Sequence, residues 1–396
     1  MRPCILAGGF YMSSEVRLGL MGAGGMGSYH AGYITAGKIK GCCLSAVFDI
    51  DQSKLDSFED VAKFTDSGEL MRSGLVDAVL IATPHYFHTS MGIEALENGL
   101  HVLVEKPISV HKADCLRLIA AHKNEKQVFS AMFNMRTVPI YNKVKQLIET
   151  GELGEMTRVN WIVTNWFRTD AYYASGGWRA TWKGEGGGVL LNQCPHQLDL
   201  LQWMTGMPSK IRAFCGFGVR HDIEVEDQVT AYMEYPNGAT GVFITSTGEA
   251  PGTNRLEITG ERGKIVVEDS QLKFIRNEVP MTEFSRAATD GFAQPAVWNI
   301  EIPSLGECGA HENITQNFVD AILNGTPLIA PGEEGIKSVE LANAMLYSTL
   351  INDTVDMPLD AEAYEVALQK LIDNSKFVKK SVKETVSNFS GSFNKV

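Results

Sequence analysis

Short apolar runs and amphipathic stretches alternate through the first third of the chain. The apolar runs, whose length and composition predict buried strands, cover residues 16–20, 44–48, 76–82, 101–104 and 128–133. The stretches with helical periodicity extend to about residue 36 and cover 54–64, 89–97 and 113–125. Strand and helix thus alternate at βαβ intervals, which predicts an α/β fold with a doubly wound parallel sheet.

A different pattern begins after about residue 150. Residues 157–167 alternate and are rich in β-branched and aromatic side chains. Two strands are predicted in each of the segments 229–247 and 256–267, because each contains a turn sequence. The remaining elements are a candidate strand, two helices and an amphipathic stretch, over 271–277, 312–323, 333–351 and 361–386. This order predicts a second α/β domain with a mostly antiparallel open sheet.

Composition narrows the class of protein. The chain has 396 residues, enough for two hydrophobic cores. Its net charge of -12 disfavours nucleic acid and membrane surfaces, because both bind concentrated Lys and Arg. The seven scattered cysteines form no Cys-x-x-Cys pair, which predicts neither a disulfide framework nor a metal site. Because the chain has no apolar stretch long enough to cross a membrane, we expect a soluble cytoplasmic protein. We expect residues 1–11 to be an upstream-start extension or a flexible tail.

A glycine-rich turn directly follows the first predicted strand and opens the first predicted helix. Its residues are Gly22, Gly24, Gly25, Met26 and Gly27, with the spacing G-x-G-x-x-G. That spacing alone is weak in a chain with 38 glycines, but a strand before it and a helix after it indicate a dinucleotide-binding Rossmann motif. Gly22 permits the tight turn, Gly24 admits a pyrophosphate and Gly27 allows close helix–sheet packing. The phosphates would lie at the helix N-terminus.

Asp49 stands at the end of the second predicted strand. An acidic residue there accepts hydrogen bonds from the adenosine ribose and repels a 2′-phosphate. Ile50 follows it and no arginine is adjacent, so the sequence favours NAD over NADP. The alternative is that Asp49 or Asp51 caps the next helix, and Asp51 is the better candidate for that role.

Three further segments carry polar residues after predicted strands or a glycine run. They are Ala82–His88, Glu105-Lys106-Pro107 and residues 186–199, in which three glycines precede Asn192 and His196. Together with the glycine-rich turn, this order resembles the glucose-fructose oxidoreductase, inositol dehydrogenase and rhizopine catabolism (Gfo/Idh/MocA) family. The resemblance covers roughly residues 16–350 and extends to the glycoside-3-dehydrogenase members.

The resemblance implies a role for each matching position. Lys106 would lie beside the nicotinamide and the substrate hydroxyl, and His196 would be the proton acceptor. Asn192 occupies a place where many members carry Asp. The remaining positions would line the cofactor or reach its nicotinamide ribose, and they are Thr83, Pro84, His88, Glu105 and Asn134.

Oxidation of a secondary alcohol gives independent reasons for these residue types. The carbon that bears the hydroxyl loses a hydride and the hydroxyl loses a proton. A histidine can take that proton near neutral pH, while Lys106 would stabilise developing alkoxide charge. Asn192 can orient an imidazole but cannot stabilise an imidazolium as a carboxylate does, which lowers the expected pKa of His196. Asp199 either supplies the missing charge or is structural. The alternatives to catalysis are a solvated loop lysine and an interior histidine.

Aromatic and basic residues gather just before the triple glycine. They are Trp166, Arg168, Tyr172, Tyr173, Trp178, Arg179 and Trp182. Because aromatic faces pack against sugar C–H groups and arginine binds hydroxyls, this cluster either lines a substrate pocket or a partner subunit, or packs within the core. The substrate candidates are Trp166, Arg168, Tyr173, Arg179 and His311, the last of which is otherwise a neighbour of a helix N-terminus.

Four segments are predicted: an N-terminal extension (1–15), a Rossmann domain (16–136), a substrate-binding and oligomerisation domain (137–360) and a helical tail (361–396). The resemblance implies that the helix near 333–351 packs on the Rossmann domain and that an open sheet face forms a homodimer or homotetramer. We expect an NAD(P)-dependent oxidoreductase, using NAD, for a ring hydroxyl of a sugar, glycoside or cyclitol, with a 3-keto glycoside as one product. The alternatives are redox-assisted glycoside cleavage with recycled NAD and a non-catalytic dinucleotide-binding sensor.

Overall fold

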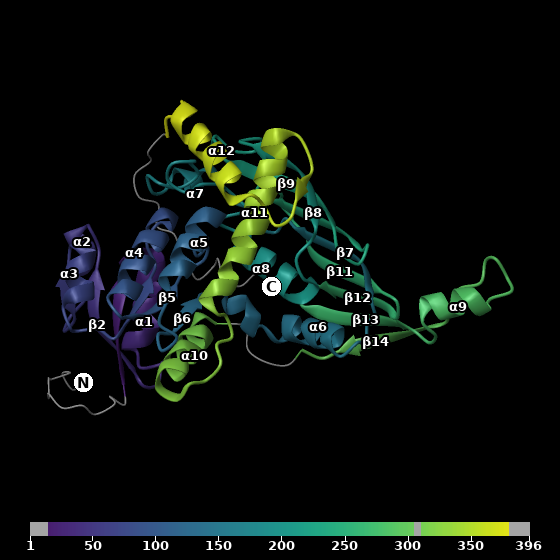
Figure 1. Cartoon of the computed structure of the whole chain (residues 1–396), viewed down its shortest axis with the longest axis horizontal. Helices are drawn as coiled ribbons and strands as arrows, with labels where there is room; N and C mark the ends of the chain where they lie inside the picture. The colour runs from purple at the N-terminus through teal and green to yellow at the C-terminus, as the bar shows by residue number, and fades with distance from the viewer. Residues whose placement is uncertain (1–14, 305–309, 380–396) are drawn as a thin grey trace. The chain divides into compact units, whose positions relative to one another are not determined.

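The computed structural model describes residues 15–304 and 310–379 (Figure 1). The proposed extension before residue 15 and the end of the amphipathic stretch after residue 379 lie outside these ranges. Within them the chain forms two compact units. The N-terminal unit comprises 15–134 and 310–339, and the C-terminal unit comprises 135–304 and 340–379. No helix in the described ranges is both long and apolar enough to cross a membrane.

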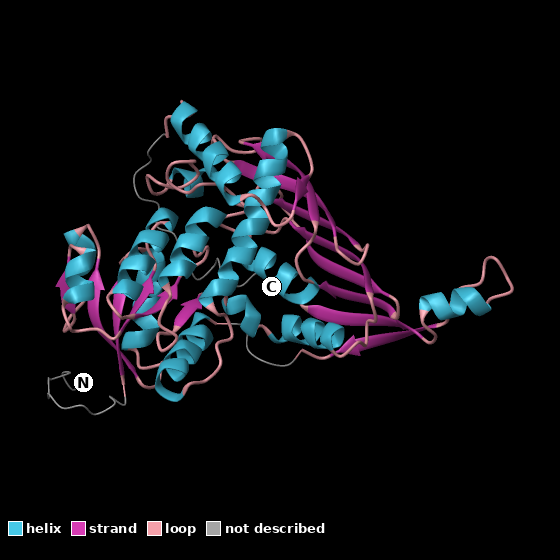
Figure 2. Cartoon of the chain, in the orientation of Figure 1, coloured by secondary structure: helices cyan, strands magenta, loops and turns pink. Residues whose placement is uncertain are grey.

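A six-stranded parallel sheet forms the centre of the N-terminal unit (Figure 2). Its strands are β1 (Val16–Met21), β2 (Cys42–Phe48), β3 (Ala62–Phe64), β4 (Ala78–Ile81), β5 (His101–Val104) and β6 (Phe129–Ala131). They lie in the order β3-β2-β1-β4-β5-β6, and every neighbouring pair is parallel. This is the strand order of a Rossmann sheet, so the predicted fold of the first domain is confirmed.

Helices connect these strands and complete the core. They are α1 (Gly25–Thr35), α2 (Gln52–Leu55), α3 (Ser67–Arg72), α4 (His85–Glu97), α5 (Lys112–Ala121), α10 (His311–Asn324) and the short 3-10 segment η2 (Gly332–Glu334). A second 3-10 segment, η1 (Asn134–Thr137), spans the boundary between the two units in the sequence. All residues of β4 are buried, as expected for a strand covered on both faces. Ile314 and Phe318 of α10 join the same hydrophobic core, although α10 follows the whole second sheet in the sequence.

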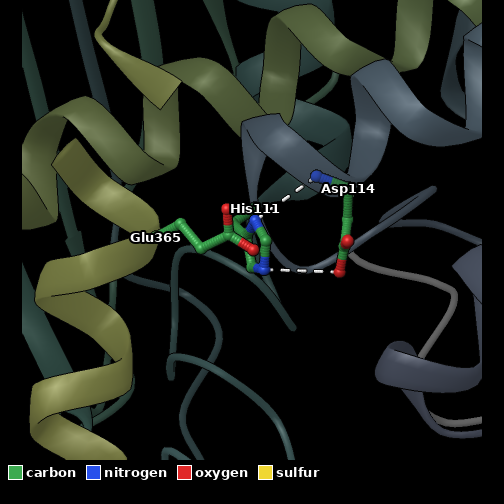
Figure 3. Close-up of side chains that lie close together, drawn as sticks. All are labelled: His111, Asp114 and Glu365. Atoms are coloured by element: carbon green, nitrogen blue, oxygen red, sulfur yellow. Dashed lines mark hydrogen bonds and ion pairs between the residues drawn. The ribbon is translucent and has the colours of Figure 1, made fainter. Parts of the chain in front are cut away.

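The N-terminus of α5 shows how a local sequence ends a loop and begins a helix. His111 is the N-cap residue, and its Nδ1 accepts a hydrogen bond from the N–H of Asp114 (Figure 3). The Nε2 of His111 lies 3.3 Å from a carboxylate oxygen of Asp114. The carboxylate lies in the first turn of α5, where negative charge is favourable to the helix dipole.

The helix predicted over 54–64 is wrong. α2 ends at Leu55, Asp60 takes a left-handed backbone conformation with φ of 57°, and Ala62–Phe64 form β3. Apolar side chains every third residue fit a helix locally, at Leu55, Phe58, Val61 and Phe64. The edge of β2 offers main-chain hydrogen bonds that a short isolated helix cannot match, and β3 pairs with it in parallel.

The C-terminal unit is built on a nine-stranded sheet. Its strands are β7 (Met156–Val163), β8 (Lys210–Phe217), β9 (Glu226–Glu234), β10 (Thr240–Ser246), β11 (Asn254–Gly260), β12 (Gly263–Glu268), β13 (Gln271–Asn277), β14 (Val297–Ile302) and β15 (Val355–Asp356). Their order is β14-β13-β12-β11-β7-β10-β9-β8-β15. β7 and β10 pair in parallel and the other described pairs are antiparallel, which confirms the predicted mostly antiparallel sheet.

One face of this sheet is packed and the other is open. The helices of the unit are α6 (Pro139–Glu149), α7 (Asp170–Ala174), α8 (Pro195–Thr205), α9 (Met281–Ala287), α11 (Gly335–Ile351), whose first turn belongs to the N-terminal unit, and α12 (Ala361–Asn374). Trp161 of β7 is fully buried and contacts Tyr141 of α6, with ring centroids 5.9 Å apart. Along β9 buried and exposed side chains alternate, and Tyr232 there and Phe214 on β8 are exposed.

The triple glycine packs against the start of β9. A Cβ on Gly188 would lie 2.0 Å from the carbonyl oxygen of Glu226, so this close approach requires glycine. The side chain of Glu226 is fully buried, and its Oε1 accepts hydrogen bonds from the N–H groups of Gly188 and Leu190 at 2.8 and 3.0 Å. Burial raises the pKa of Glu226 to about 7, although these two N–H groups act in the opposite direction.

Glu226→Gln should change how stability depends on pH. Because folding raises the pKa of Glu226 from 4.5 to about 7, the folded protein binds more protons than the unfolded chain between these values. The contribution of Glu226 to stability therefore falls as pH rises through this window. The variant should gain about 3 kcal/mol in free energy of unfolding relative to the wild type across the window. Urea unfolding of both proteins at several pH values measures this, and a constant difference between them would contradict it.

Candidate functional site

The residues predicted to bind the cofactor lie at the carboxyl ends of the parallel strands. They are the turn 22–27 after β1, Asp49 after β2, Thr83 and Pro84 after β4, Glu105 and Lys106 after β5, and Asn134 after β6. In doubly wound sheets, ligands bind outside this edge. The N-terminal unit therefore brings these positions to one edge of its sheet, although they are scattered over more than a hundred residues.

The glycine-rich turn has the geometry that its sequence predicts. Gly22 has a φ of +97°. A Cβ on Gly27 would lie 1.8 Å from the carbonyl oxygen of Gly22, so the first turn of α1 packs directly against the glycine-rich turn. A Cβ on Gly24 would meet nothing within 4 Å. Gly25 and Met26 form the first residues of α1, whose N-cap Gly24 has no side chain and whose first turn has no acidic residue. The helix thus presents N–H groups to open space, which suits a phosphate.

Asp49 ties this turn to the end of β2. It is buried, and its Oδ2 accepts a hydrogen bond from the N–H of Ala23 at 2.9 Å. Its Oδ1 accepts a hydrogen bond from the main-chain N–H of Asp51, also at 2.9 Å. Lys54 Nζ lies 3.4 Å from Oδ1. Asp51 caps α2 by accepting from the N–H of Ser53, so the capping role falls to Asp51. A carboxylate has about four acceptor sites, which leaves Asp49 capacity for ribose hydroxyls.

His88 holds two loops at this edge by their main chains. Its Nδ1 lies 2.8 Å from the carbonyl oxygen of Pro107, and its Nε2 lies 2.8 Å from that of Thr83. Burial lowers the pKa of His88, and the two carbonyl oxygens oppose that shift because they accept from an imidazolium. The hydroxyl of Thr83 is buried and has no hydrogen-bond partner among the described residues, while Pro84 is the N-cap residue of α4.

Glu105 is a buried carboxylate directly before Lys106. Its Oε1 lies 2.7 Å from Nε2 of His30 on α1, and its Oε2 accepts a hydrogen bond from the N–H of Lys106 at 3.1 Å. Burial alone would raise the pKa of Glu105, but the hydrogen bond and charge of His30, with the charge of Lys106, hold that pKa well below its ordinary value. Glu105 is therefore ionised at neutral pH, and Lys106 itself is half-buried.

The contacts of His30 continue to α10, where His311 lies. The Tyr33 hydroxyl lies 2.5 Å from Nδ1 of His30 and 2.7 Å from Oγ1 of Thr315. The ring of His311 lies edge-on to those of Tyr29 and His30, with centroids 5.4 and 5.6 Å apart. Burial lowers the pKa of His311 to about 4, so its imidazole is neutral at neutral pH. The structure thus places His311 within the packing of the N-terminal unit.

The segment after the triple glycine is a turn that leads into a helix. α8 begins at Pro195, so Asn192 precedes the helix and His196 lies in its first turn, and the two are not related by helical spacing. Asp199, further along α8, accepts hydrogen bonds from Nε and Nη2 of Arg136 at 2.8 and 2.7 Å. Both side chains are buried. The charge of Asp199 is therefore balanced by Arg136, which favours a structural role for Asp199 over a role as the charged partner of His196.

The amide of Asn192 is held from both ends. Its Nδ2 donates a hydrogen bond to Oε1 of Glu185, and its Oδ1 accepts one from the hydroxyl of Tyr172 at 3.3 Å. Glu185 is buried and also accepts a hydrogen bond from the N–H of Ala180 at 2.6 Å. Burial raises the pKa of Glu185, with the charge of Arg179 acting in the opposite direction. The carboxylate of Glu185 thus contacts the amide of Asn192.

Tyr172 is at the centre of the aromatic and basic cluster. Its hydroxyl accepts hydrogen bonds from Nη1 of Arg179 at 2.6 Å and from Nε2 of Gln193 at 3.0 Å. The guanidinium groups of Arg179 and Arg168 lie 4.5 and 5.0 Å from the centre of its ring. Arg168 also lies 5.4 Å from the ring of Trp166. The structure therefore brings together four of the cluster residues with Gln193.

The remaining cluster members shape the loop that carries this group. Tyr173 is buried, with its hydroxyl 2.7 Å from Oγ1 of Thr247 and its ring 4.7 Å from that of His221. Lys379, after α12, donates a hydrogen bond to the carbonyl oxygen of Arg179 at 2.8 Å. The N–H of Trp182 donates to Glu224 at 2.9 Å. The loop is thus fixed by main-chain contacts on both sides of Arg179.

Several buried polar atoms of the C-terminal unit have no hydrogen-bond partner among the described residues. The donors are Trp166 Nε1 and Arg179 Nε, and the acceptors are Gln193 Oε1, Gln197 Oε1 and Glu226 Oε2. Most buried polar atoms in proteins are paired, so such a group requires an explanation. Arg179 and Gln193 both contact Tyr172, which places two of these atoms in the cluster.

Sequence reasoning missed three residues of these arrangements. His30 shares a face of α1 with Tyr33, but nothing in the sequence indicates that Glu105 lies beside it. Glu185 directly precedes the triple glycine and Gln193 directly follows Asn192. Their position next to the motif could have identified both as candidate site residues.

Two family models match the chain. One, described as the oxidoreductase family with an NAD-binding Rossmann fold, matches residues 16–133. The other, the GFO/IDH/MocA C-terminal domain, matches residues 141–266. These matches confirm the predicted family and the predicted NAD-binding fold.

Named relatives cover parts of the chain. Inositol 2-dehydrogenase of Corynebacterium glutamicum is 30% identical over 200 residues, which are 49% of this chain and 56% of that protein. The matched part thus spans little more than half the length of this relative. Levoglucosan dehydrogenase of Pseudarthrobacter phenanthrenivorans is 25% identical over 318 residues, which are 72% of this chain and 80% of that protein.

Solved structures share the fold over most of the chain. The WlbA dehydrogenase of Chromobacterium violaceum, in complex with NADH and UDP-GlcNAcA, has a TM-score of 0.76 at 25% identity and covers 88% of this chain and 98% of its own. A levoglucosan dehydrogenase in complex with NADH and L-sorbose has a TM-score of 0.72 at 21% identity, covering 87% and 99%. With both of its domains matched, the chain belongs to the Gfo/Idh/MocA family of oxidoreductases, and its cofactor is NAD.

Proposed function

We propose that the protein is an NAD-dependent dehydrogenase that oxidises a ring hydroxyl of a sugar, glycoside or cyclitol. The observation that carries this proposal is the set of unpaired polar atoms around Tyr172. Arg179 Nε is a donor that needs an acceptor, and Gln193 Oε1 is an acceptor that needs a donor. A hydroxyl group can be both, so a polyhydroxylated ring pairs them. Because unpaired buried groups are costly, such pairing gives both affinity and selectivity.

The surroundings of these atoms support a ring with an apolar face. Tyr172 and Trp166 offer aromatic surfaces, which pack well against the C–H groups of a sugar ring. The names of two relatives, inositol 2-dehydrogenase and levoglucosan dehydrogenase, refer to hydroxylated ring compounds. A glycoside oxidised at its third carbon, giving a 3-keto glycoside, is the finer form of this proposal.

The residues of this chain supply proton transfer and charge stabilisation. His196 takes the hydroxyl proton, since an imidazole accepts protons near neutral pH. Asn192, which follows the triple glycine, presents a fixed amide to the substrate. Lys106 stabilises the negative charge that develops on the oxygen. NAD, when bound, accepts the hydride. Its pyrophosphate suits the open space over Gly24, and its adenosine ribose suits Asp49.

We also propose that copies of the chain associate through the open face of the second sheet. Phe214 and Tyr232 are exposed on adjacent strands of that face, and large exposed apolar side chains mark interaction surfaces. Phe214→Asp should therefore shift the protein to a smaller species in light scattering coupled to size exclusion. A matched change at an exposed aromatic elsewhere, Phe87→Asp on α4, should leave the mass unchanged. A wild-type monomer would contradict the proposal.

Two glycine substitutions should separate cofactor binding from folding. Gly24→Ala should fold normally and weaken NAD binding by about tenfold or more, because its Cβ enters space that the pyrophosphate occupies. Gly27→Ala should destabilise the fold by about 1–3 kcal/mol, because its Cβ meets a carbonyl oxygen. Titration calorimetry with NAD and thermal unfolding measure the two effects. NAD binding by Gly24→Ala equal to the wild type would exclude a pyrophosphate at that position.

The activity itself is tested by nicotinamide absorbance with NAD and a panel of inositols, free sugars, and aryl and C-glycosides. One class should give NADH, and Lys106→Ala and His196→Ala should each lower kcat by about 100-fold or more. Lys126→Ala, an exposed lysine of the same unit, is the matched control and should keep full activity. Substrate loss without NADH would indicate a cofactor recycled within one turnover. A wild-type protein that consumes no member of the panel would contradict the proposed function.

A further inference from the structure

We propose that His30 and His88 are positioning residues that fix Lys106 by holding the segment 105–107 from both ends. The inference rests on the proposed function for the role of Lys106, but the hold itself is a property of the N-terminal unit. No pattern in the sequence assigns either histidine this role, and the resemblance places His88 among residues that line the cofactor.

The first hold acts on the residue before Lys106. His30 is fully buried, and its Nε2 lies 2.7 Å from Oε1 of Glu105. The other oxygen of Glu105 accepts the N–H of Lys106 at 3.1 Å, so the carboxylate connects α1 to the main chain of Lys106. Tyr33, 2.5 Å from Nδ1 of His30, fixes the imidazole in turn and is itself 2.7 Å from Thr315. Both nitrogens of His30 are thus engaged.

The second hold acts on the residue after Lys106. His88 is buried, and its two nitrogens face the carbonyl oxygens of Pro107 and Thr83, each at 2.8 Å. Both ring nitrogens face main-chain carbonyl oxygens, so neither is directed at a cofactor; the neutral ring donates to one of the two carbonyls, and the protonated ring donates to both. His88 instead couples the end of β4 to the segment after β5. Lys106 therefore lies between two main-chain anchors made by buried imidazoles.

A purely structural role does not account well for these groups. Replacing buried charged or polar pairs by apolar side chains is often neutral or stabilising, so such groups are a poor way to gain stability. They are an effective way to fix geometry, because both partners lose their hydrogen bonds if either moves. A displacement of about 1 Å in a reacting group can cost about 100-fold in rate. Fixing the main chain of Lys106 meets that requirement.

The test uses His30→Gln and His88→Gln in the full chain, with Tyr33→Phe as a milder change in the same network. The matched control is His122→Gln, because His122 also joins a carboxylate, Glu333 at 2.6 Å, to a carbonyl oxygen, Gln127 at 2.9 Å, elsewhere in the unit. Amide hydrogen exchange, read by mass spectrometry on peptides covering 103–109, reports the hold directly. NAD affinity, kcat and thermal unfolding are measured on the same proteins.

We expect faster exchange in 103–109 and a kcat lowered by about 10- to 100-fold in His30→Gln and His88→Gln, with NAD affinity within about twofold of the wild type. Tyr33→Phe should show smaller changes of the same kind, and His122→Gln should lose only thermal stability. Unchanged exchange in both variants, or a kcat no lower than that of His122→Gln, would overturn the inference. If the wild type turns over no substrate, the proposed function fails, and the exchange rates alone then confirm or overturn the hold.

Discussion

The constraint on which much of this structure depends is the burial of carboxylates at the ends of strands. An ionised carboxylate inside a protein is tolerated only if it is paired, so its partners become fixed. Glu105 shows this most clearly, because its oxygens contact a side chain on α1 and the main chain of Lys106. The position of α1, the end of β5 and the segment that follows are thereby coupled through one charge.

The C-terminal unit uses the same device with main-chain partners. Glu226 accepts two N–H groups of the triple-glycine turn, and Asp227 accepts those of Val219, Arg220 and His221. Glu105 and Glu226 differ in the charge of their partners. His30 and nearby cations hold the pKa of Glu105 low, whereas Glu226 has dipolar partners alone and burial raises its pKa. Glu105 therefore serves as a charge, and Glu226 as a hydrogen-bonding anchor for a loop.

What the sequence predicted follows from the range of the forces involved. The βαβ pattern, the glycine-rich turn and the hairpin at Asn237-Gly238 are local, so their residues carry the information. β3 and β8 were not predicted: β3 has only three residues, and β8 is joined to its partner β9 by residues 218–225 rather than by a short hairpin turn. The same limit hid the contact of His30 with Glu105, which lies 75 residues away along the chain. Tertiary contacts decide such cases, and local pattern does not describe them.

Under the proposed role of His196 as the proton acceptor, an asparagine at position 192 has a physical rationale. A proton acceptor must be deprotonated when oxidation begins, and a carboxylate beside an imidazole raises its pKa, which favours the protonated form. An amide does not. Here the carboxylate is one hydrogen bond further away, on Glu185, whose pKa is itself raised by burial. The amide of Asn192, oriented by Glu185 on one side and Tyr172 on the other, thus offers fixed polarity without adding a full charge at that position.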